Sequence, residues 1–133
     1  MTRRHGSSEA LALVLAFVAC SAPPSIRLDS TASHTTPVFA LAPQGTSDDA
    51  RISAFRVDAC NARGSPPIDT HWLTVAPNEP QTVARITYGI PPSGWRSAQG
   101  PHPLTPGCYR AAIAGAPPLE FDIGIDGRAT ARR

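Results

Sequence analysis

Motifs that would identify a familiar activity are missing from this chain. It has no Gly-x-Ser-x-Gly elbow of a hydrolase, and no Cys-x-x-Cys or His-x-x-x-His spacing of a metal site. The run Asp122–Gly127 lacks the further oxygen ligands of a calcium loop. Asp69, His71 and Ser93 hold the groups of a triad, but Ser93 follows two prolines instead of lying on an elbow. We therefore expect no enzyme activity, no cofactor and no metal site, with Asp69 and His71 as a solvated surface pair and His102 exposed.

Lysine is also absent, so every basic side chain other than histidine is an arginine. The chain has 12 basic and 10 acidic residues, and without Arg3, Arg4 and Glu9 of its amino-terminal leader it keeps ten arginines against nine acidic residues. Binding to nucleic acid requires a clustered basic face. The arginines here are dispersed through a nearly neutral chain, so no nucleic-acid partner is expected.

No apolar run is long enough to cross a bilayer as a helix. The longest, Ala10 to Ala19, would span about 15 Å as a helix, against roughly 30 Å of hydrocarbon. It follows the basic pair Arg3-Arg4 and ends on small residues, which is the organisation of a secretory signal peptide. The sequence thus predicts export instead of a membrane span.

The end of this leader, Phe17-Val18-Ala19-Cys20, resembles the lipobox of bacterial lipoproteins. The resemblance implies a signal peptide over 1–19, a diacylglyceryl thioether on Cys20, and an acylated new amino terminus carrying a chain such as palmitate. Ser21, in place of an aspartate, favours the outer membrane, with the protein anchored there and facing the periplasm. Ordinary cleavage after Ala22 is the alternative.

The cysteine count agrees with a lipid on Cys20. Three cysteines are an awkward number in an exported protein until one is assigned to lipid, and Cys60 and Cys108 then form a pair. In an oxidising compartment we expect them to form a disulfide, which would contribute roughly 4 kcal/mol by restricting the unfolded chain.

Composition divides the exported chain into two parts. Residues 20–47 are rich in Ser, Thr, Pro and Ala and predict a lipid-anchored flexible linker. Within them Val38–Leu41, between Pro37 and Pro43, is either a first edge strand or loosely packed linker. Residues 48–130 contain short period-two segments separated by Pro and Gly, which predict an all-β fold, a small antiparallel β-sandwich. The expected strands cover 52–60, 70–75, 83–88, 108–114 and 119–125. The strand 70–75 carries Trp72, and the alternation in the other strands predicts one apolar face made of Phe55, Val57, Ala59, Ala84, Ile86, Tyr88, Tyr109, Ala111, Ile113, Leu119, Phe121, Ile123 and Ile125.

The turn before the last cysteine supports this fold class. Leu104-Thr105-Pro106-Gly107-Cys108-Tyr109 resembles the Leu-x-Pro-Gly-x-Tyr step of immunoglobulin-like and transthyretin-like modules. The resemblance implies a β-sandwich, and we expect Tyr109 to point into the core with its hydroxyl on the backbone. It names no activity.

The long connection from Gly89 to Pro106 carries the remaining candidates, Trp95 and Arg96. They could form a partner-binding loop, because Trp and Arg are common at interface hot spots, although in so small a domain we favour Trp95 covering the core.

The leading hypothesis for the function is a non-enzymatic interaction or structural module of the cell envelope. The alternatives are a solute- or glycan-binding module that uses the Trp95 loop, and an accessory subunit or inhibitor of a periplasmic enzyme or secretion complex.

Overall fold

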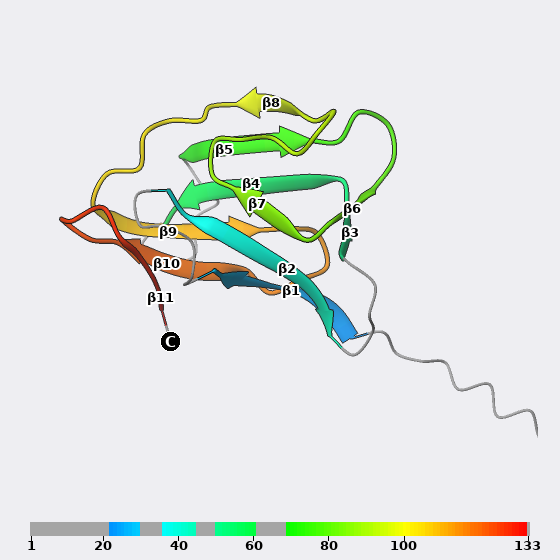
Figure 1. Ribbon diagram of the computed structural model, residues 1–133. Coiled ribbons are helices and arrows are strands. Elements are labelled where there is room, and N and C mark those ends of the chain that lie inside the picture. Colours follow the sequence, from blue (N-terminus) through cyan, green and yellow to red (C-terminus); the bar gives the residue numbers. More distant parts are fainter. Residues whose placement is uncertain (1–21, 30–35, 45–49, 61–68, 133) are drawn as a thin grey trace, which may run out of the picture.

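The computed structural model describes residues 22–29, 36–44, 50–60 and 69–132 (Figure 1). The strands are β1 (Ala22–Leu28), β2 (Val38–Gln44), β3 (Ala50–Ile52), β4 (Ala54–Ala59), β5 (Thr70–Val75), β6 (Gln81–Val83), β7 (Arg85–Thr87), β8 (Arg96–Gln99), β9 (Gly107–Ala112), β10 (Leu119–Ile123) and β11 (Ala129–Ala131). Within these ranges no helix has the length and apolar character to cross a membrane.

The strands form three antiparallel sheets. A six-stranded sheet has the order β11-β10-β9-β4-β5-β8, a three-stranded sheet has the order β1-β2-β7, and β3 pairs with β6. Figure 1 shows the three-stranded sheet lying across one face of the six-stranded sheet. The predicted all-β class is therefore confirmed, in a sandwich-like arrangement.

Aromatic side chains fill the space between the two larger sheets. The ring of Phe39, on β2, lies 5.1 Å from that of Phe55 on β4 and 5.4 Å from that of Phe121 on β10. Phe55 in turn contacts Trp72, at 5.8 Å. All four residues have an exposed fraction of 0%. One residue of the three-stranded sheet thus packs against two strands of the other sheet at once.

The period-two alternation correctly assigned most inward-facing residues. Those found buried as expected are Phe55, Val57, Trp72, Ile86, Tyr88, Tyr109, Ala111, Ile113, Phe121 and Ile123. Ala84 was expected on the same face as Ile86, yet it is exposed, and Ile125 was expected on the same face as Ile123, yet it is 97% exposed. Strand β10 ends at Ile123, and the N–H of Gly127 donates to the carbonyl of Gly124 at 3.0 Å, which closes a turn into β11. The turn interrupts the alternation and carries Ile125 outward.

The flexible linker expected over 20–47 is wrong for the described part of that range. Residues 22–28 and 38–44 are strands β1 and β2, paired with each other, and β2 also pairs with β7. Phe39 and Leu41 enter the core, at 0% and 4% exposed. A stretch with few apolar residues is ordered because Phe39 and Leu41 of β2, together with Ile26 of β1, pack into the core. Positions 30–35 and 45–47, the leader 1–19 and Cys20 lie outside the described residues.

The predicted disulfide between Cys60 and Cys108 is confirmed, with Cα atoms 5.2 Å apart. It lies where β4 ends and β9 begins, and these strands are neighbours in the six-stranded sheet. The N–H of Cys60 also donates to the carbonyl of Cys108, at 2.9 Å. The bond therefore joins two segments that the sheet already holds together.

The antiparallel pairing defines two ends of the sandwich. The β1-start end contains the beginning of β1, the end of β2, strands β3 and β6, and the turns 76–80 and 113–118. The disulfide end contains Cys60, Cys108, the start of β5 and the turn 124–127. In Figure 1 the first is on the right and the second on the left, where the red hairpin of β10 and β11 turns.

Replacement of Phe39 tests whether the residues before 48 belong to the fold. We expect Phe39→Ala to lower the free energy of unfolding by about 3–5 kcal/mol, because it opens a cavity between the sheets. Arg27→Ala, on the exposed side of β1, should change it by less than about 0.5 kcal/mol. Urea unfolding followed by tryptophan fluorescence measures both, and equal midpoints for the two variants would contradict the packing described.

Candidate functional site

A β-bulge at His71 creates the most distinctive polar site. Val57 of β4 pairs with Trp72 of β5, but the next residue, Asp58, pairs with Thr70, so His71 is an extra residue on β5. Bulges bend a strand and redirect its side chains. The imidazole of His71 lies against the ring of Tyr109, 5.1 Å between centroids, and its Nδ1 is 3.4 Å from the backbone oxygen of Asp69. The expectation of a surface pair between the Asp69 and His71 side chains missed this bulge.

The loop from Gly100 to His102 is fixed directly on top of this bulge. The N–H of His102 donates to the carbonyl oxygen of His71 at 2.9 Å. Gly100 has a φ of +69°, and a Cβ there would lie 2.0 Å from the same His71 oxygen. The hydroxyl of Tyr88 donates to the carbonyl of His102 and lies 3.4 Å from that of His71. Only glycine fits this approach, and the contacts hold the two histidines side by side.

Together these residues line an open polar cavity of about 270 Å³ at the disulfide end. Its walls are Asp69, Thr70, His71, Gln99 and His102. The two imidazole centroids are 6.2 Å apart, with the rings nearly perpendicular. Within the described ranges no group of three or more His, Cys, Asp or Glu residues is arranged to hold a metal ion. The cavity can offer two imidazoles and an amide to a polar group of a partner.

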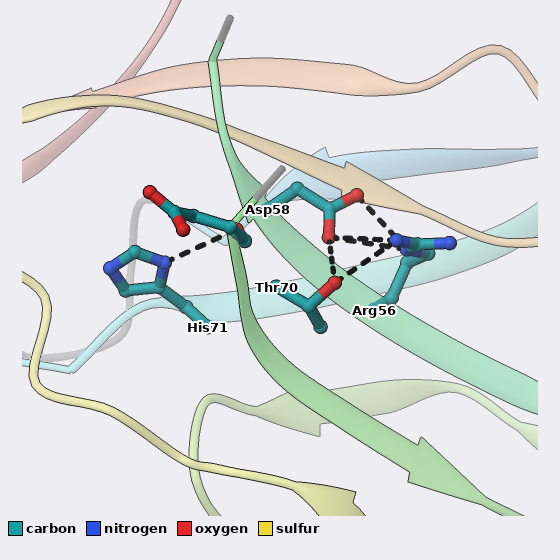
Figure 2. Close-up of polar contacts among 5 residues, drawn as sticks. Arg56, Asp58, Thr70 and His71 are labelled. Atoms are coloured by element: carbon teal, nitrogen blue, oxygen red, sulfur yellow. Dashed lines mark hydrogen bonds and ion pairs between the residues drawn. The ribbon is translucent and has the colours of Figure 1, made fainter. Parts of the chain in front are cut away.

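The wall of the cavity is supported from behind by a buried carboxylate. Asp58 is 3% exposed, and its carboxylate accepts from Arg56 Nε at 2.9 Å and from the hydroxyl of Thr70 at 2.9 Å. Arg56 Nη2 also donates to Thr70 Oγ1, at 3.1 Å. Figure 2 shows this cluster beside His71, the next residue of β5. A buried charge needs such partners, so the cluster fixes the start of β5 where the bulge begins.

The same face of the six-stranded sheet carries further ion pairs. Arg110 on β9 pairs with Glu120 on β10 at 2.8 Å, and Arg132 pairs with Asp122 at 2.9 Å. With Arg56 and Asp58 these make three acidic and three basic groups on neighbouring strands. The face is therefore polar and neutralises its own charge, which agrees with the nearly neutral count of the sequence.

The loop of Trp95 and Arg96 does not present an exposed indole. Trp95 is 7% exposed, belongs to the core, and donates from its indole N–H to Gln81 Oε1 at 2.9 Å. Arg96 is exposed and begins β8, which forms an edge of the six-stranded sheet. The favoured expectation, that Trp95 covers the core, is confirmed, and the indole of a partner-binding loop is not available at the surface.

Ser93 and His102 are the two other residues that the sequence singled out. Ser93 makes no hydrogen bond with Asp69 or His71 in the described part of the chain, so the three are not linked as a triad. His102 was expected to be exposed, and it is, but its place beside His71 had no signal in the sequence because 30 residues lie between them in the chain.

A second cavity, of about 420 Å³, lies between two parts of the sandwich. One wall is the end of β1 with the start of β2, and the other is β11 with the turn that precedes it.

Comparison of the chain with protein-family models, with curated proteins and with solved structures finds no match.

The close approach of Gly100 can be tested against a matched glycine in the same connection. Gly94 also has a positive φ, +83°, but nothing lies within 4 Å of a Cβ placed there. Gly94→Ala should cost about 1–2 kcal/mol of stability from backbone strain alone. Gly100→Ala should cost about 1–3 kcal/mol more, because the loop must leave the His71 carbonyl.

Urea unfolding gives the two stabilities, and nuclear Overhauser contacts between the His71 and His102 rings report the loop position. These contacts should weaken in Gly100→Ala and persist in Gly94→Ala. Equal stabilities with unchanged ring contacts would contradict the proposed seating of the loop.

The Tyr88 hydroxyl should make stability depend on pH in alkaline solution. Burial raises the pKa of Tyr88 from 10.0 to about 12. Between these values the unfolded chain releases the proton and the folded chain keeps it. The free energy of unfolding therefore holds its full value below about pH 10 and falls as the pH rises toward about 12.

Tyr88→Phe should remove this part of the pH dependence and cost about 0.5–1.5 kcal/mol at neutral pH through the lost hydrogen bond. Urea midpoints measured from pH 7 to pH 12 compare the variant with the wild type. Parallel curves for the two proteins would show that Tyr88 does not titrate as stated.

Proposed function

We propose that this protein is a lipid-anchored, non-enzymatic module of a bacterial cell envelope, attached through Cys20 and facing the periplasm. The observation that carries the proposal is the cysteine pairing. The Cys60–Cys108 bond accounts for two of the three cysteines, and the remaining one ends a short apolar leader in the sequence Phe17-Val18-Ala19-Cys20. A cysteine at that position is the acceptor in lipoproteins.

The anchor would be strong enough to hold the domain permanently. Each buried methylene contributes about 0.8 kcal/mol, and a second acyl chain converts marginal binding into stable attachment. A diacylglyceryl thioether together with an acylated amino terminus exceeds that requirement. Ser21 after Cys20 supports the outer membrane as the destination.

The module itself is proposed to be of the immunoglobulin-like or transthyretin-like kind. Tyr109 supports this: it is 3% exposed, and its hydroxyl donates to the carbonyl of Thr105 at 2.7 Å and accepts from the N–H of Thr105 at 3.0 Å. Closure of the turn before a strand by a tyrosine hydroxyl is a feature of such sandwiches. The fold is common to many functions, so the role is argued from the surface.

An interaction or structural role suits that surface better than a glycan site at the Trp95 loop. The indole on which the glycan reading depended is buried, and the outer face of the large sheet neutralises its own charges. The polar cavity beside His71 and His102 leaves the disulfide end as the contact region for an envelope partner.

Replacement of Cys20 tests the anchor. We expect wild-type protein made in a double-membrane bacterium to incorporate labelled palmitate and to partition into detergent, whereas Cys20→Ser should do neither and should accumulate as precursor. The double variant Cys60→Ala/Cys108→Ala is the matched control, because it loses the two disulfide-bonded cysteines and should keep the lipid. Palmitate incorporation and detergent partitioning of Cys20→Ser at the wild-type level would overturn the proposal.

A further inference from the structure

The distance along the chain between the anchor and the fold is very short. Strand β1 begins at Ala22, so only Ser21 separates it from Cys20. Two residue steps of extended chain span at most about 7 Å. A lipid on Cys20 would therefore keep the beginning of β1 within that reach of the headgroups. The long spacer expected from composition would have allowed any orientation, but so short a connection does not.

The β1-start end is chemically suited to lie on a lipid surface. The turn 113–118 has the sequence Ile-Ala-Gly-Ala-Pro-Pro and contains no charged residue. The turn 76–80 contains one, Glu79. The basic side chains of Arg51, on β3, and Arg96, beside the end of β5, are exposed at the same end. In the two described turns only Glu79 would lose the hydration of a charge on contact, and the two arginines can pair with lipid phosphate.

Among the described residues, the opposite end carries two exposed carboxylates, Asp69 and Asp126, together with Arg128 and the cavity of His71 and His102. Carboxylates repel lipid phosphate, so this end is less suited to lie on the headgroups. Strands of six or seven residues place it about 20 Å farther along the sandwich. Figure 1 shows the two ends at opposite sides of the molecule.

We propose that the β1-start end rests on the lipid headgroups, so that the disulfide end, with its histidine cavity, points away from the membrane toward the periplasm. This inference rests on the proposed anchor at Cys20 and adds an orientation to it. The strands of the sandwich then run from the membrane surface toward the periplasm, and the domain has a fixed orientation instead of moving freely on a tether. A partner meets the disulfide end first.

The absence of lysine allows a direct test. Arg51→Lys and Arg128→Lys are matched conservative changes at opposite ends, and each introduces a unique side-chain amine for an amine-reactive fluorophore. Wild-type protein labelled in parallel is the blank and reports any dye on the amino terminus. The purified lipidated proteins are reconstituted in vesicles of phosphatidylethanolamine and phosphatidylglycerol, with and without lipid that carries a nitroxide on its headgroup. Flotation first establishes that each protein is bound.

Quenching by the headgroup nitroxide should be about threefold or more stronger for Arg51→Lys than for Arg128→Lys, because contact-range quenching does not extend over the length of a strand. Aqueous iodide should show the reverse order. Flotation with equal or reversed quenching would overturn the orientation and leave the anchor standing. If the protein purified from the bacterium carries no lipid and does not float with the vesicles, the proposed anchor is overturned, and the orientation with it.

Discussion

The fold depends on the contact of Phe39 with the rings of Phe55 and Phe121. The chain has eight aromatic residues, and the seven that follow Cys20 are each at most 8% exposed. A small domain buries a smaller fraction of its surface than a large one does, so each of its aromatic rings is needed in the core. Phe39 matters most because it brings a second sheet onto the first. Without that second sheet the six-stranded sheet would expose an apolar face.

The polar atoms of these buried rings determine where the loops lie. The indole N–H groups of Trp72 and Trp95 donate to Ser97 Oγ and Gln81 Oε1, and the hydroxyl of Tyr88 donates to the carbonyl of His102. Buried donors need partners, so each ring fixes a piece of the connection between β7 and β9. The histidine cavity is a result of this requirement, because the loop that Tyr88 holds is the one that carries His102.

Sequence reasoning succeeded where one local rule decides the outcome and failed where a distant contact does. Alternation placed Phe55, Phe121 and most of the core, and cysteine pairing placed the disulfide. Strand β1 was missed because the Ser, Thr, Pro and Ala composition of 20–47 predicted a linker, whereas β1 is held by its pairing with β2, with a register shift between Ala22 and Pro24. The bulge at His71 and the approach of Gly100 had no sequence signal at all, since both depend on pairing across strands. The leader and the lipid on Cys20 are predicted from sequence alone and stay predictions, so the proposed anchor and the site rest on different kinds of observation.

Two of the edge strands affect how copies of this protein would meet one another. One edge of the three-stranded sheet is β1, whose two prolines lack the N–H that a neighbouring strand would need. One edge of the six-stranded sheet is β8, where Leu73 pairs with Gln99 and Thr74 with Ser97, so the strand is irregular at its middle. Irregular or proline-containing edges are poor templates for further pairing. Crowding on a surface would bring such edges together often, and these two edges would resist pairing when that happens.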